Sequence, residues 1–77
     1  MTYPTFIARF LHDGATALKC HQTGTRYIVA EHRAGPLRDE CGAYREGKLI
    51  MTGPRAAAIN AVESDARWQL RNGGLSA

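Results

Sequence analysis

Three glycine-containing dipeptides, Asp13-Gly14, Thr23-Gly24 and Glu46-Gly47, interrupt the chain before residue 52. Glycine reaches the backbone conformations that tight turns need, and Asp-Gly in particular favours a two-residue hairpin turn. The runs between these dipeptides are short and rich in β-branched and aromatic residues, which favour strands. We therefore expect a meander of strands at 5–12, 16–22 and 25–32, a loop at 37–42, and a second hairpin at 43–45 and 48–51.

The remainder of the chain favours a helix. Thr52 or Gly53 can serve as its N-cap, and Pro54 is tolerated in the first turn because its missing N–H would have no partner there. Alanine-rich sequence continues to about Asn72, and Gly73-Gly74 can end the helix. The expected fold class is α+β: an antiparallel β-meander of three to five strands followed by one C-terminal α-helix packed on the sheet, as a single domain over residues 1–77.

The composition narrows the class of protein. A 77-residue chain with 44% hydrophobic and 22% charged residues is typical of one small globular domain. Its longest apolar runs have four residues, too short for a signal peptide or a membrane span, so we expect a cytoplasmic protein without a membrane partner. In that compartment Cys20 and Cys41 favour free thiols. The net charge of +3 is a mild bias toward an anionic partner.

The faces of the expected helix differ in character. A period of 3.6 residues places Ile59, Val62, Ala66 and Leu70 on one stripe, which we expect to pack on the sheet. Trp68 falls nearly opposite that stripe. Either the N-terminal segment or the loop around Leu37 covers it, or the helix bends before it, or it is the centre of a contact surface. In the last interpretation the candidate partner-binding residues are Trp68, Arg67, Arg71, Asn60 and Ser64.

The faces of the expected sheet follow from the turns. Two-residue turns at Asp13-Gly14 and Thr23-Gly24 fix the register, although a slip of one residue inverts every assignment. One face then carries Ile7, Arg9, Leu11, Leu18, Cys20, Tyr27 and Val29. The other carries Phe6, Ala8, Phe10, His12, Ala17, Lys19, His21, Arg26, Ile28, Ala30 and His32. Either face could carry the helix.

If the helix covers the first face, the second is an open sheet with aromatic rings among basic side chains. Single-stranded nucleic-acid binders use that arrangement, because bases stack on the rings and cations contact the phosphates. The candidate nucleic-acid-binding residues in this alternative are Phe6, Phe10, Lys19 and Arg26. In the competing interpretation, Phe6 and Phe10 belong to the core.

No motif indicates catalysis or metal binding. The possible metal ligands have no zinc-type spacing; they are His12, Cys20, His21, His32 and Cys41. The glycines form neither a dinucleotide-binding nor a phosphate-binding motif. We therefore expect no catalytic residues, no metal and no cofactor, and a protein that is not an enzyme.

The stretch Thr52-Gly53-Pro54-Arg55-Ala56-Ala57-Ala58-Ile59, the size and the order of strands before a helix resemble small phage-encoded anti-CRISPR proteins. The resemblance implies a non-enzymatic inhibitor, in the host cell cytoplasm, that docks on a CRISPR-Cas effector complex and blocks DNA binding or cleavage. Many members are acidic DNA mimics, whereas this chain is basic, so binding to an acidic protein surface, or near the bound nucleic acid, fits better. The order of strands and helix is also similar to HicB-type antitoxins, which implies neutralisation of a small toxin. Monomer and homodimer both stay open.

Overall fold

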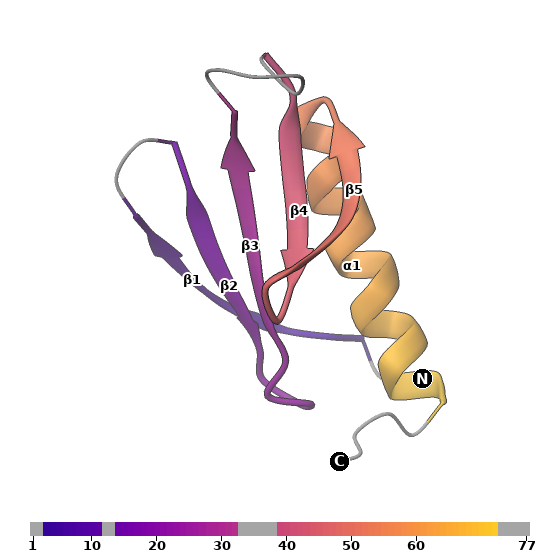
Figure 1. Cartoon of the computed structure of the whole chain (residues 1–77). Coiled ribbons are helices and arrows are strands. Elements are labelled where there is room, and N and C mark those ends of the chain that lie inside the picture. The colour runs from indigo at the N-terminus through magenta and orange to yellow at the C-terminus, as the bar shows by residue number, and fades with distance from the viewer. Residues whose placement is uncertain (1–2, 12–13, 33–38, 73–77) are drawn as a thin grey trace.

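The computed structural model describes residues 3–11, 14–32 and 39–72, which form one antiparallel sheet and one helix (Figure 1). The strands lie in the sheet in chain order, so the expected α+β meander with a C-terminal helix is confirmed. The elements are β1 (Phe6–Phe10), β2 (Thr16–Cys20), β3 (Arg26–Glu31), β4 (Cys41–Arg45), β5 (Lys48–Gly53) and α1 (Arg55–Arg71).

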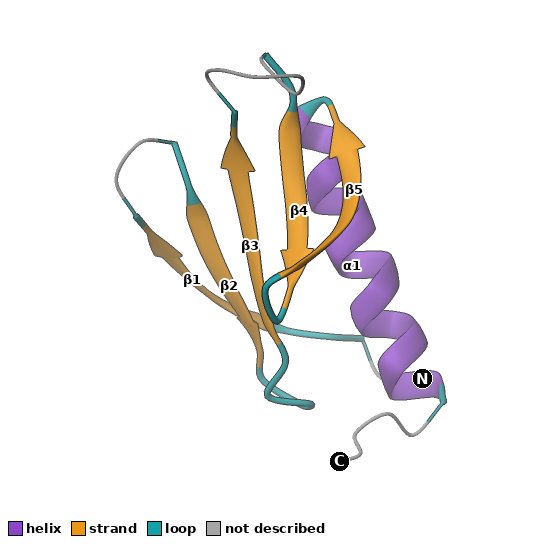
Figure 2. Cartoon of the chain, viewed as in Figure 1, coloured by secondary structure: helices purple, strands orange, loops and turns teal. Residues whose placement is uncertain are grey.

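The helix covers only part of one sheet face. It packs mainly on β3, β4 and β5, and Arg55 at its start also donates to Thr16 of β2 at 3.1 Å, while most of β1 and β2 extends beyond it (Figure 2). Ala58, Val62 and Ala66 recur every four residues and are buried against Ala43 of β4 and its neighbours. Small side chains on both layers allow the helix to approach the sheet closely. The core consists of Cys20, Tyr27, Val29, Cys41, Ala43, Ala58, Val62 and Ala66.

Two expectations for the helix were wrong in detail. The buried stripe begins at Ala58, whereas Ile59 is 44% exposed. Close packing against Ala43 selects the row of small residues, although Ile59 is the more hydrophobic side chain. The N-cap position is held by Pro54, with no capping bond from a side chain, because Thr52 and Gly53 complete β5.

The hairpin of β4 and β5 confirms the turn predicted at Glu46-Gly47. Both residues have positive φ, 49° and 86°, as a type I′ turn requires. The expected loop at 37–42 was wrong at its end, because Cys41 and Gly42 pair with Glu31 and Ala30 in the sheet. Leu37 lies outside the described residues.

The register of β1 differs from the one expected. The Leu11 N–H donates to the Ala15 carbonyl at 2.9 Å, so three residues separate the strands instead of two. Gly14, with φ of 73°, occupies the left-handed position typical of three-residue loops. The extra residue inverts the strand: Phe6 pairs with Cys20, and Phe10 with Thr16. The side chains of Phe6, Ala8 and Phe10 therefore point to the helix side, and those of Ile7 and Arg9 point away from it.

The register between β2 and β3 keeps the expected faces. Cys20 N–H donates to Thr25 at 2.9 Å, which leaves a four-residue connection where two were expected. The difference is an even number, so the alternation of faces is unchanged. The side chains expected to share a face do so on the helix side; they are Leu18, Cys20, Tyr27 and Val29. His12, from the other predicted face, lies outside the described residues.

The segment before β1 returns to the end of the helix. Gln22 holds it, because its Oε1 accepts the Thr5 N–H at 2.9 Å and its Nε2 donates to the Tyr3 carbonyl at 2.9 Å. Tyr3 consequently lies under the guanidinium of Arg67, with the guanidinium carbon 5.2 Å from the ring centroid. Figure 1 shows the described segment before β1 running toward the last turns of α1.

Candidate interaction surfaces

Trp68 lies on the exposed side of α1, where its residue surface is 54% exposed. Asn60, Ser64, Arg67 and Arg71 are also exposed and follow one another along the same side of the helix. We call these five residues the helix outer surface. The structure thus brings together the side chains that the sequence predicted as a group, and in the described residues the N-terminal segment reaches Arg67.

Hydrogen bonds hold the backbone at Trp68, and an ion pair and a ring contact hold its neighbour Arg67. The Asn72 N–H and its Nδ2 both donate to the Trp68 carbonyl, at 2.9 and 2.8 Å, and so close the helix end. Arg67 is held by Glu63 at 3.3 Å, in addition to its contact with Tyr3. Within the helix outer surface, Trp68 therefore lies beside an arginine, Arg67, whose side chain is already held in place.

A polar bridge joins the sheet to the helix beneath this surface. The Tyr27 hydroxyl donates to Asp65 Oδ2 at 2.6 Å, and Arg45 Nη1 donates to Asp65 Oδ1 at 2.7 Å. Burial, followed by the hydrogen bond and the negative charge of Asp65, raises the pKa of Tyr27 well above its usual range. Sequence reasoning missed this bridge. The one feature of the sequence that could have indicated the bridge is an acidic residue, Asp65, next to the buried stripe of the helix.

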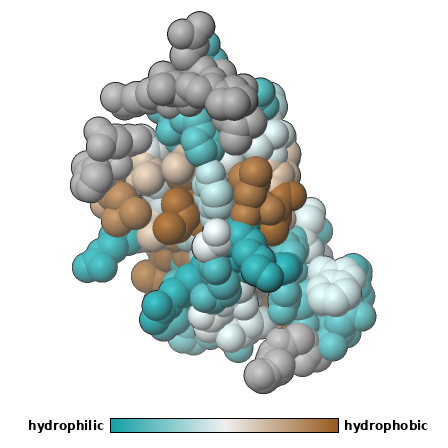
Figure 3. Space-filling view, in the orientation of Figure 1, coloured by the Kyte–Doolittle hydropathy of each residue, from teal (hydrophilic) through white to brown (hydrophobic). Residues whose placement is uncertain are grey.

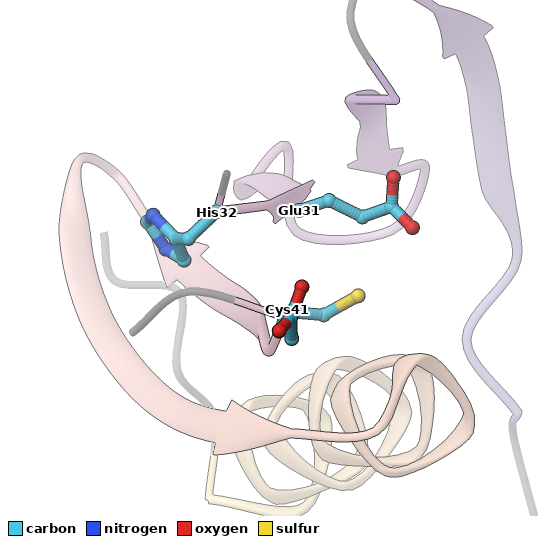
Figure 4. Close-up of a pocket in the computed structure, with 4 residues that line it drawn as sticks. Glu31, His32 and Cys41 are labelled. Atoms are coloured by element: carbon cyan, nitrogen blue, oxygen red, sulfur yellow. The ribbon is translucent and has the colours of Figure 1, made fainter. Parts of the chain in front are cut away.

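Tyr27 lies near the start of β3, and a hollow lies at the opposite end of this strand. The hollow is lined by Glu31, His32, Asp39 and Cys41. Figure 4 shows that His32 points away from the side taken by Glu31 and Cys41. The His32 Nε2 instead lies 2.9 Å from the Tyr44 hydroxyl. Within the described ranges, no group of three His, Cys, Asp or Glu side chains could hold a metal ion.

The two cysteines are both buried and free. Cys20 follows Lys19, which pairs with Arg26 at the start of β3, whereas Cys41 pairs with Glu31 at its end. Five residue steps separate Arg26 from Glu31 by about 17 Å, and Cys20 lies one step farther from Cys41 than Lys19 does. A disulfide between them is therefore impossible in this fold.

The sheet face away from the helix, called here the open face, differs from the one predicted for nucleic acid. Lys19 and Arg26 lie on it, as expected. Phe6 and Phe10 do not: Phe6 packs edge-on against Tyr27, and Phe10 projects to the helix side beyond the helix, 83% exposed. Their assignment to the open face was wrong because of the three-residue loop. The open face carries Ile7, Arg9, Ala17, Lys19, Arg26, Ile28, Ala30, Gly42, Tyr44, Leu49 and Thr52.

No family model, curated protein or solved structure matches this chain. The likeness to anti-CRISPR proteins and to HicB-type antitoxins therefore stays a prediction. In the part of the chain that is described, no helix is long and apolar enough to cross a membrane.

Proposed function

We propose that this protein works by binding, without catalysis, and that it occupies a protein partner through the helix outer surface. The observation that carries the proposal is the exposure of Trp68, 54%, on the side of α1 opposite the buried residues Ala58, Val62 and Ala66. Tryptophan and arginine dominate the centres of protein interfaces, so their exposure side by side favours a contact at this place.

The surroundings of Trp68 suit such a centre. Arg67 is already positioned by Tyr3 and Glu63, so less side-chain entropy is lost when it meets a partner. Asn60 and Ser64 provide small polar groups along the same side of the helix. Arg71 adds a second positive charge, which favours a partner with an acidic surface.

The partner that the architecture suggests is a CRISPR-Cas effector complex in a bacterial cytoplasm, which the chain would inhibit by blocking DNA binding or cleavage. Support for this identity is the size and the order of a strand meander before an alanine-rich helix. The net charge of +3 supports an acidic protein surface as the target, in place of mimicry of DNA.

The test is Trp68→Ala. We expect its free energy of unfolding to stay within about 0.5 kcal/mol of the parent, because an exposed side chain is removed. Binding to purified CRISPR-Cas effector complexes, measured by biolayer interferometry, should weaken by about 2 kcal/mol, roughly 30-fold. Ile59→Ala is the matched control, since Ile59 is an exposed apolar residue elsewhere on α1.

Equal losses from Trp68→Ala and Ile59→Ala would mean that the helix outer surface is not the contact. A drop of several kcal/mol in the stability of Trp68→Ala would place the indole in the core. Absence of binding to all effector complexes would remove the proposed partner.

A further inference from the structure

Three of the five lysine and arginine side chains in the described strands lie on the open face. Arg9, Lys19 and Arg26 are exposed there, and in the described strands this face has no aspartate or glutamate. In the described part of the chain, none of these three side chains has a hydrogen-bond or ion-pair partner. At the rim, Glu46 is held by the Arg26 backbone N–H at 2.8 Å. The other strand arginine, Arg45, is paired with Asp65 on the helix side.

Apolar side chains form a row beside these charges. Ala17, Ile28, Tyr44 and Leu49 are direct cross-strand neighbours, and Arg9 extends the row on β1. Ile7, Lys19 and Arg26 form the next row. With strands about 4.8 Å apart, the five-stranded row spans about 19 Å. Figure 3 shows patches of apolar surface across the middle of the molecule, separated by a paler strip, with hydrophilic surface below them.

Gly42 lies next to this row, between Ala30 and Thr52, and leaves space above the sheet for two of its side chains. A Cβ at this position would lie 2.8 Å from His32 Nε2, 3.0 Å from Tyr44 Cε2 and 3.2 Å from Leu49 Cδ1. The Tyr44 ring and the Leu49 side chain therefore lie over the glycine. The hydrogen bond between the Tyr44 hydroxyl and His32 fixes the ring there.

We infer that the open face binds single-stranded nucleic acid, with Arg9, Lys19 and Arg26 on the phosphates and the Tyr44 row against the bases. Unpaired cations match the charge of the phosphates, and an apolar row with an aromatic ring matches unstacked bases. A duplex hides its bases, so it would leave the apolar row without a partner. The inference goes beyond the proposed function and uses a different face of the molecule.

The experiment is fluorescence anisotropy of a labelled single-stranded oligonucleotide, titrated with the protein over a series of salt concentrations. Three phosphate contacts predict a slope of about −2 for log K against log salt. The triple variant Arg9→Gln, Lys19→Gln, Arg26→Gln should abolish most of that slope and weaken binding at least about tenfold at low salt. Tyr44→Leu, which keeps bulk over Gly42, should weaken binding about tenfold with the slope unchanged.

The matched control is Lys48→Gln, Arg67→Gln, Arg71→Gln, which removes the same number of positive charges from outside the open face. Retained binding in this control, and in Trp68→Ala, supports the open face and separates it from the proposed protein contact. Equal weakening in both triple variants overturns the inference, as does the absence of binding at low salt. Duplex binding as tight as single-strand binding overturns it too, and so does binding confined to anionic lipid vesicles. A thermal melt of each variant confirms that it is folded.

Discussion

Replacing Asp65 by alanine should lower the free energy of unfolding by about 2 kcal/mol, and the melting temperature by about 8–16 °C. The Tyr27 side chain is 1% exposed, and its hydroxyl donates to Asp65 at 2.6 Å. Without the carboxylate, this buried donor loses its acceptor, which costs about 1–3 kcal/mol. The ion pair with Arg45 adds less, because Arg45 is partly exposed. The core of a domain of this size supplies only about 3–5 kcal/mol of net stability in total.

Two further variants identify the cause of that loss. Asp65→Asn keeps an acceptor for Tyr27 and should cost about half as much. In a double-mutant cycle with Tyr27→Phe, the two losses should overlap by about 1 kcal/mol, because both remove the same hydrogen bond. Chemical denaturation of the four chains measures this. Strict additivity, or a loss below about 0.5 kcal/mol for Asp65→Ala, would show that the bridge does not hold helix and sheet together.

The second large effect is expected in alkaline solution. The pKa of Tyr27 is raised in the folded chain, first by burial and then by Asp65, whereas an unfolded tyrosine titrates near about pH 10. Above that pH the unfolded chain releases a proton that the folded chain keeps, so stability falls as pH rises. Below about pH 10, the stabilisation that the raised pKa of Tyr27 provides is fully present. By about pH 11, Tyr27 alone should have cost the protein about 1 kcal/mol.

The check is a comparison of urea unfolding at about pH 8 and about pH 11, on either side of the ordinary tyrosine pKa. Tyr27→Phe should lose less stability between the two than the parent does, and Tyr3→Phe, at an exposed position, should lose as much as the parent. If Tyr27→Phe and the parent lose stability in parallel, the hydroxyl of Tyr27 is not buried against Asp65.

The fold could be predicted from the sequence where local chemistry decides it. Glu46 and Gly47 both have the positive φ angles of the predicted turn, and the strands predicted on either side of it are paired in the structure. The Asp13-Gly14 turn could not be resolved in the same way, because Asp-Gly suits both two-residue and three-residue loops. One residue of difference was enough to move Phe6 and Phe10 to the other face.

The candidate sites also divide into those that a local sequence pattern indicates and those that only the folded structure reveals. Trp68 was found from helical periodicity, which is a local property, and its exposure follows from the packing of the opposite side. The bridge of Tyr27, Asp65 and Arg45 joins residues up to 38 apart in the sequence, so no local pattern indicates it. The unpaired cations of the open face became visible as a set only after the register placed Arg9 beside Ala17.

The most direct test of the proposed contact is the fluorescence of Trp68 in the isolated protein at high dilution. Trp68 is the one tryptophan in the chain, so the emission reports on this position alone. We expect the red-shifted emission of an indole in water and full quenching by acrylamide, with a blue shift and protection once a partner binds. Blue-shifted emission that resists quenching in the isolated, diluted chain would show that the helix outer surface is already covered, and would contradict the proposal.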